Sequence, residues 1–155
     1  VFTKLPKTMK PRMNIEELMP ESYKALFNLS GTLTKSKLTL IQKQLIKIRA
    51  SQINGCAFCI DMHTKEALKA RETQQRIFLL NAWRETDLFT PEEKAILAIT
   101  EEVTLIHQHG ISDATYQQAQ QFFDTETIAQ IVMAVIVINA WNRLSISSLT
   151  QVPVN

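Results

Sequence analysis

Glycine and proline are scarce in this sequence, with 3 glycines and 5 prolines among 155 residues. The three glycines lie too far apart for a phosphate-binding loop, which needs two or three glycines close together. A β-sandwich or barrel needs turn residues about every 8–12 positions, and the sequence has no such series. Long segments without proline, such as the one between Pro20 and Pro91, are typical of helices. The composition therefore predicts a mostly helical protein of one domain.

Neither sign of charge dominates, because 17 lysines and arginines stand against 15 acidic residues. A nucleic-acid-binding protein usually concentrates basic residues on one face, and no basic run here exceeds a few residues. The longest uninterrupted apolar run, Ile131–Ile138, is much shorter than the roughly 20 residues that cross a bilayer. The sequence also does not open with a charged and then apolar signal segment. We therefore expect no nucleic-acid partner, no membrane association and a cytoplasmic location.

The pattern of apolar and helix-capping residues divides the chain into three parts. Residues 1–19, which contain two prolines and several lysines, predict an extended N-terminal arm; residues 20–149 predict a helical domain, and residues 150–155 a C-terminal tail. Thr90-Pro91-Glu92-Glu93 is the clearest helix start, because it joins a capping threonine, a proline at the first position and acids in the first turn. We expect helices at about residues 20–31, 38–54, 56–70, 72–83, 91–107, 112–123 and 125–145.

The last of these expected helices is apolar on almost every side, from Ile128 through Trp141. A helix with almost no polar face is either central to its fold or shared with another subunit. Because the chain is short, the pattern favours a subunit interface.

Cys56 and Cys59 form a CxxC pair, and His63 follows four residues after the second cysteine. Because residues three and four apart share a helix face, Cys59 neighbours both Cys56 and His63. The start of a helix stabilises a thiolate, and an imidazole can accept and return the proton. Two thiols at this spacing can also close a disulfide after one is oxidised to a sulfenic acid. The cluster therefore predicts a thiol-based redox cycle.

Two other interpretations compete for the same cysteines. Buried cysteines are often small core residues, although the histidine beside this pair argues against that. Structural zinc needs four ligands, so His107 or His109 would have to join the three residues of the cluster. Both histidines lie near a helix end and are expected at the surface, and we expect no metal and no other cofactor.

The segment Arg49–His63, with the letters RASQINGCAFCIDMH, resembles the core motif of the alkylhydroperoxidase D-like (AhpD-like), carboxymuconolactone decarboxylase superfamily. The segments Leu80–Thr86 and Ile138–Arg143 resemble its short, single-domain branch, and the resemblance extends from about residue 16 to residue 148. It implies an all-α, compact domain built for oligomerisation as a dimer, trimer or hexamer. It also implies thiol-dependent reduction of a hydroperoxide substrate, with electrons from a dithiol donor. Decarboxylase members generally lack the cysteine pair, which argues against decarboxylation.

Carried over by position, the resemblance makes Cys59 the peroxide-attacking thiol, Cys56 the resolving thiol and His63 part of the proton relay. The peroxidase members have a glutamate twelve residues before the first motif cysteine, and Gln44 occupies that position here. Glutamine forms hydrogen bonds but does not accept a proton as a carboxylate does.

This departure leaves two possibilities for the proton relay. Either another acid substitutes, with Glu101 and Glu102 as candidates, or peroxidase activity is weaker. The second possibility leaves open a disulfide-exchange or redox-sensing protein with little peroxide turnover.

Overall fold

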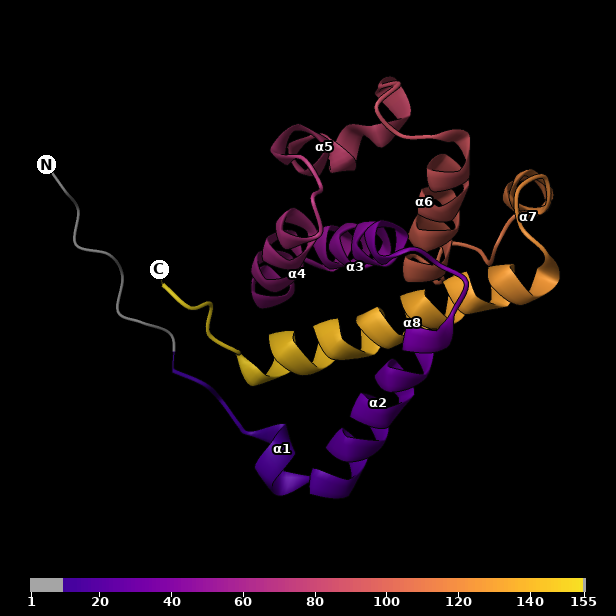
Figure 1. Ribbon diagram of the computed structural model, residues 1–155. Coiled ribbons are helices and arrows are strands. Elements are labelled where there is room, and N and C mark those ends of the chain that lie inside the picture. The colour runs from indigo at the N-terminus through magenta and orange to yellow at the C-terminus, as the bar shows by residue number, and fades with distance from the viewer. Residues whose placement is uncertain (1–9, 155) are drawn as a thin grey trace, which may run out of the picture.

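The computed structural model describes residues 10–154, and within that range every regular element is a helix (Figure 1). The expected all-α fold is therefore confirmed. In chain order the elements are α1 (Ile15–Leu18), α2 (Pro20–Thr32), the 3-10 helix η1 (Leu33–Lys35), α3 (Leu40–Asn54), α4 (Ala57–Lys69), α5 (Gln74–Phe78), the 3-10 helix η2 (Leu80–Glu85), α6 (Pro91–Thr104), α7 (Asp113–Gln120) and α8 (Thr125–Ser148).

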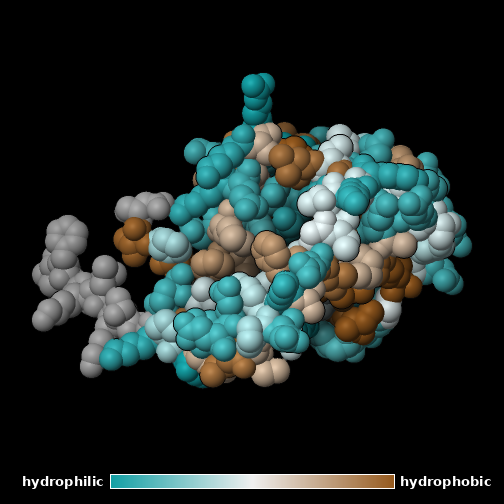
Figure 2. Space-filling view, turned by 60° about the horizontal axis from the view of Figure 1, so that its bottom comes forward, coloured by the Kyte–Doolittle hydropathy of each residue, from teal (hydrophilic) through white to brown (hydrophobic). Residues whose placement is uncertain are grey.

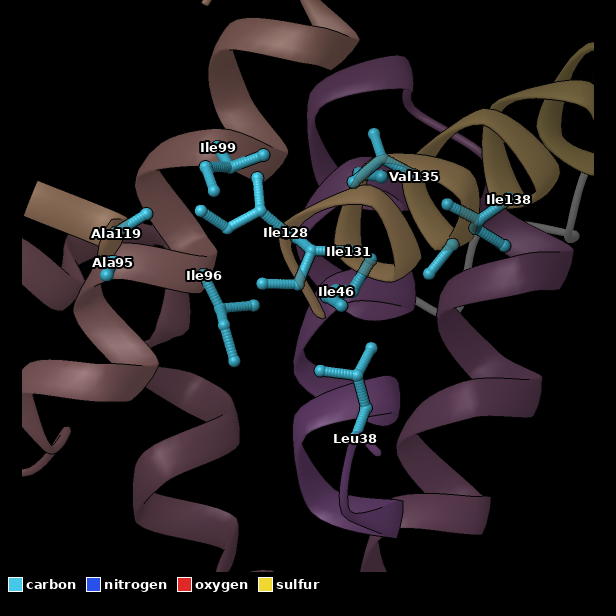
Figure 3. Packing of buried hydrophobic residues seen from close by; sticks show 12 residues of the cluster. Leu38, Ile46, Ala95, Ile96, Ile99, Ala119, Ile128, Ile131, Val135 and Ile138 are labelled. Carbon is cyan, nitrogen blue, oxygen red and sulfur yellow. The ribbon is translucent and has the colours of Figure 1, made fainter. Parts of the chain in front are cut away.

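The long helix α8 extends along the bundle, and α2, α3, α4, α6 and α7 all contact it (Figure 1). Figure 3 shows how isoleucines and smaller apolar side chains of α3, α6 and α8 meet in the main core, among them Ile46, Ile96 and Ile131. A second cluster, which includes Leu45, Ala67 and Trp83, joins α3 to α4, η2 and α6. These two clusters fix α3 in the middle of the fold.

Contacts within the chain account for part of the apolar character of α8, because ten of its residues are buried and six of these are apolar. By length and composition alone this helix could cross a membrane, but 44% of its most apolar window is buried inside the bundle. Met133, Ile136 and Ile146 remain exposed on α8. Apolar surface also lies between hydrophilic side chains on the face shown in Figure 2. The structure gives α8 a central position within one chain, and the subunit interface that the sequence pattern favours stays a prediction.

Local capping chemistry determines where several helices begin. Thr90 Oγ1 accepts the backbone N–H of Glu93 at 3.2 Å, and the Glu93 carboxylate accepts the N–H of Thr90 at 2.9 Å. This reciprocal pair confirms the predicted start of α6. Asp124 caps α8 in a related way by accepting the N–H of Thr127 at 2.7 Å.

Several expected element limits differ from the structure, and three of these differences bear on the fold. Tertiary contacts accompany two of them. The expected helix 72–83 is divided into α5 and η2, and Ala82 has non-helical dihedrals. The break accompanies burial of Trp83, whose indole N–H donates to Glu101 of α6 at 2.8 Å. The expected helix 91–107 ends at Thr104. Glu102, in the last turn of this helix, accepts hydrogen bonds from Ser112 and Thr115 at the start of α7.

The third difference concerns the arm. Residues 1–9 lie outside the described range, and Ile15–Leu18 form one helical turn instead of an extended segment. The Asn14 side chain starts that turn by accepting the N–H of Glu16 at 3.1 Å. The Arg12 N–H donates to the carbonyl of Ser148 at 2.9 Å, which joins the arm to the end of α8 (Figure 1).

Gly55 ends α3 and allows the chain to turn directly into α4. Its φ of 70° lies in the left-handed region, where a side chain is strained. Its N–H and the N–H of Cys56 bond back to carbonyls of the last turn of α3. Gly31 is a useful contrast, because it lies inside α2 with a negative φ and open space around it.

We expect Gly55→Ala to lower the free energy of unfolding by about 1 kcal/mol, because alanine is strained at positive φ. The matched substitution Gly31→Ala should leave the stability unchanged or raise it by up to about 1 kcal/mol, because alanine is the better helix former. Urea unfolding of both variants with the disulfide intact measures the difference. A change of the same sign and size in both variants would contradict this account of the α3–α4 turn.

Candidate redox-active site

The two cysteines lie at the first turn of α4 and are joined by a disulfide with an S–S distance of 2.11 Å. Cys56 is the N-cap residue, and its sulfur accepts the backbone N–H of Cys59 at 3.3 Å. Both residues are buried, at 1% and 2% exposure. After reduction, the unpaired N–H groups and the positive end of the helix dipole would stabilise a thiolate at Cys56.

His63 lies one helical turn after Cys59, and Ala67 follows one turn later. All three residues are buried on the side of α4 that packs against α3. The imidazole is thus on the same face of α4 as the sulfur of Cys59, as the spacing predicts. The structure brings together the three residues of the sequence motif.

A carboxylate that sequence reasoning did not select completes the cluster. Glu66 Oε2 lies 3.0 Å from Nδ1 of His63, and it also accepts a hydrogen bond from Nε2 of Gln44 at 3.0 Å. Gln44 comes from α3 and is buried, with its Oε1 atom left without a partner. Glu66 is the more exposed member, with 44% of its side chain accessible. Gln44 stands at the position of the family glutamate, and Oε2 of Glu66 therefore connects it to His63.

Burial, helped by the charge of Lys47, keeps the imidazole of His63 neutral near neutral pH. Burial lowers the pKa of His63 below its ordinary value, and the positive charge of Lys47 lowers it further, against the opposing effect of Glu66. Partial burial by itself raises the pKa of Glu66, but hydrogen bonds from His63 and Gln44 and the charge of Lys47 outweigh it and lower that pKa. An ionised carboxylate thus faces a neutral histidine.

This charge state fixes the tautomer of His63. An ionised carboxylate only accepts hydrogen bonds, so Nδ1 of the neutral ring carries the proton that it donates to Glu66. The other ring nitrogen, Nε2, is then unprotonated and able to take a proton from a thiol. The site therefore has an unprotonated ring nitrogen on a residue one helical turn after Cys59.

Neither of the acids suggested by the sequence contacts His63. Glu101 accepts hydrogen bonds from Arg49, Trp83 and Arg84, and these outweigh burial to lower its pKa. It ties α3, η2 and α6 together. Glu102 bonds to Ser112 and Thr115 at the start of α7. Both carboxylates have structural roles, and Glu66 is the acid that neighbours the imidazole.

Sequence reasoning assigned no role to Glu66 or Lys47, although both leave a weak signal. Glu66 follows His63 by three residues, which places them on neighbouring positions of one helix, and Lys47 is related in the same way to Gln44. The other histidines, His107 and His109, are exposed. Among residues 10–154, no group of three or more His, Cys, Asp and Glu side chains is arranged to hold a metal ion.

We expect the two charged neighbours of His63 to move its pKa in opposite directions. Glu66→Gln removes the anion that favours the protonated ring, so the pKa should fall further. Lys47→Met removes a cation, so the pKa should rise. NMR titration of the His63 ring in the disulfide form measures both shifts. Asp61→Asn is the matched control on α4, because Asp61 pairs with Lys65, and it should leave the His63 pKa unchanged. Shifts of the same sign in the first two variants would contradict the charge arrangement.

Comparison with known proteins agrees with this geometry. Residues 20–102 match the carboxymuconolactone decarboxylase family. The chain is 42% identical over 139 residues to the uncharacterized protein YdfG of Bacillus subtilis, which covers 90% of this chain and 95% of that protein.

Solved structures share the arrangement of helices. A protein of unknown function from Agrobacterium tumefaciens, described as a candidate antioxidant defence protein AhpD, superposes with a TM-score of 0.91 at 38% identity, over 94% of this chain and 100% of that one. The debrominase Bmp8 superposes with a TM-score of 0.78 at 15% identity, over 88% of this chain and 74% of that one, and this likeness concerns the fold alone. By its sequence and its fold, the chain belongs to the carboxymuconolactone decarboxylase family and is AhpD-like.

Proposed function

We propose that the protein is a thiol-dependent peroxidase that reduces hydroperoxides by cycling Cys56 and Cys59 between dithiol and disulfide. One observation carries the proposal: the disulfide lies at the start of α4, on the same helix face as a neutral His63 that is oriented by Glu66. The description of the Agrobacterium tumefaciens relative as a candidate antioxidant defence protein supports the same assignment.

In the first step, Nε2 of His63 takes the proton of the reduced Cys59 thiol. The thiolate attacks one oxygen of the hydroperoxide, the O–O bond breaks, and Cys59 becomes a sulfenic acid. His63 returns its proton to the departing oxygen, which leaves as an alcohol. The sulfur is oxidised by two electrons, and the peroxide is reduced by two.

In the second step, Cys56 attacks the sulfenic acid. Its position at the N-cap of α4 favours the thiolate form that this attack requires. The S–S bond forms, and the hydroxyl group leaves as water with the proton of the Cys56 thiol. A dithiol donor then reduces the disulfide by thiol–disulfide exchange and is itself oxidised to a disulfide.

Gln44 stands where the peroxidase members of the family have a glutamate, but a carboxylate is still present beside His63. Gln44 donates to Glu66, and Glu66 contacts His63, so the negative charge lies on α4 instead of α3. We infer that Glu66 is a positioning residue that orients the imidazole of His63. On this account, Gln44 is compatible with full peroxidase turnover.

Substitution of either cysteine tests the cycle. Cys59→Ser should abolish peroxide reduction, because it removes the attacking sulfur. Cys56→Ser should still react once with a hydroperoxide and stop at a Cys59 sulfenic acid, which dimedone traps and mass spectrometry locates. Steady-state peroxide reduction with a dithiol donor measures turnover. Trapping at position 56 in Cys59→Ser, with turnover retained, would contradict the assigned roles. Disulfide exchange by the wild type with no peroxide consumption would favour the disulfide-exchange alternative.

Moving the carboxylate from position 66 on α4 to position 44 on α3 tests the role of Glu66. Glu66→Gln should lower kcat/KM by about tenfold to a hundredfold, because the tautomer of His63 is no longer fixed. Gln44→Glu alone places a second carboxylate against Glu66, so one of the two must take up a proton, and activity should also fall. The double variant Gln44→Glu/Glu66→Gln restores a single carboxylate and should recover most of the activity. A double variant no better than Glu66→Gln alone would contradict the inference.

A further inference from the structure

Helix α8 has one accessible face that the rest of the chain does not cover. Along this face, accessible residues recur at alternating spacings of three and four: Glu126, Ala129, Met133, Ile136, Ala140, Arg143 and Ser147. This is the heptad pattern of helices that pack side by side in coiled coils. Met133 and Ile136 are 36% and 45% exposed. Ile131 and Ile138, on the opposite side of α8, are buried in the main core (Figure 3).

The four central residues of this face, Ala129, Met133, Ile136 and Ala140, are all apolar, and we call them the α8 stripe. The stripe is complementary to itself when a second copy of α8 lies against it in the opposite direction. A two-fold axis between positions 134 and 135 sets Met133 opposite Ile136 of the second copy, and Ala129 opposite Ala140 of the second copy. The large side chains then fill the middle of the contact, and the alanines allow the helices to approach closely at both ends.

The charges that border the stripe specify the same direction of pairing. Glu126 and Arg143 lie at equal distances from the two-fold axis, so each faces the opposite charge of the second copy in the antiparallel arrangement. A parallel arrangement would set Glu126 against its own copy and Arg143 against its own copy, and like charges in contact are unfavourable.

Both charged side chains are accessible for these pairs. Glu126 is bound to Lys37 at 2.8 Å but keeps 68% of its side chain accessible. Nη1 of Arg143 donates to the carbonyl and to Oδ1 of Asn139, and Arg143 forms no salt bridge within residues 10–154. An accessible cation without an acidic partner therefore lies at one end of the stripe, and an accessible acid lies at the other.

A groove of about 390 Å³ runs along one edge of the stripe and extends the surface beyond a single helix. It is lined by Ala129 and Met133 of α8 together with Leu33 of η1. In the antiparallel register, the half-exposed Leu144 of the second copy projects from the same edge toward this groove. Apolar side chains on both copies thus meet beside the stripe as well as along it.

We propose that the α8 stripe docks against the α8 stripe of a second copy of this chain in antiparallel orientation, with Glu126 of each copy paired to Arg143 of the other. The sequence pattern predicts only that this helix takes part in an interface, and the structure adds the face, the direction and the pairs. Of the assemblies that the family resemblance implies, a dimer and a hexamer can contain this two-fold contact, and a trimer cannot. The inference does not depend on the proposed peroxidase function.

Reversal of one charge in each pair tests the proposal in the disulfide form of the protein. Glu126→Arg sets two cations against each other at both ends of the contact, and Arg143→Glu sets two anions against each other. Each variant alone should raise the dissociation constant of the two-fold contact by about tenfold or more. An equimolar mixture of the two variants should associate as tightly as the wild type, because every pair in the mixed contact again joins an acid and a base. Analytical ultracentrifugation measures the three samples.

Asp113→Arg is the matched control, because Asp113 is an exposed acid in the first turn of α7, as Glu126 is in the first turn of α8. It should leave the assembly unchanged, and circular dichroism shows whether each variant is folded. A wild type that stays monomeric or forms a trimer would overturn the proposal. So would single variants that associate like the wild type, or a mixture that associates no better than the single variants.

A distance measurement tests the direction of pairing separately. With the disulfide intact, Ser147→Cys carries a single free thiol for a nitroxide label. Because a helix rises about 1.5 Å per residue, the labels of two antiparallel copies should lie about 40 Å apart. A parallel pair would hold them at about the 10 Å that separates packed helices. A pulsed electron paramagnetic resonance distribution without a distance near 40 Å would overturn the antiparallel contact.

Discussion

The left-handed turn at Gly55 is the constraint on which the candidate site depends. It ends α3 and starts α4 within two residues, so the two helices pack against each other from their shared corner onward. The same turn makes Cys56 the cap of α4 and places its sulfur against the N–H of Cys59. A longer or more flexible connection would no longer hold the start of α4, and with it the cysteines, against α3. The position of a single glycine therefore controls both the geometry and the electrostatics of the sulfurs.

The α3–α4 contact also supplies the second half of the site. Because the helices lie side by side, Gln44 and Lys47 of α3 reach the side chains of α4. Gln44 orients Glu66, Glu66 holds Nδ1 of His63, and Lys47 opposes protonation of the ring. The result is an uncharged base with its free nitrogen available, which is the form that thiol deprotonation requires. A glutamine at position 44 is thus consistent with a proton relay, since the carboxylate lies on the neighbouring helix.

The parts of the fold that depend on local chemistry could be predicted from the sequence. The start of α6 follows from the reciprocal bonds of Thr90 and Glu93, and the face shared by Cys59 and His63 follows from helical spacing alone. Glu66 received no role from the sequence, because its link to Gln44 joins residues 22 positions apart on two helices. The break between α5 and η2 was missed for a similar reason, because it accompanies the bond between Trp83 and Glu101. In each case a contact between two separate helices determines the feature, and a local sequence pattern does not show which helices come into contact.

The cycle of thiols and disulfide is the central claim, and its stoichiometry tests it most directly. The reduced wild type is mixed with one equivalent of cumene hydroperoxide in the absence of any donor, and free thiols and 2-phenyl-2-propanol are counted together. The account predicts that both thiols of each chain are lost as one alcohol is formed, with a Cys56–Cys59 disulfide as the product. Retention of both thiols while the hydroperoxide remains intact would contradict it.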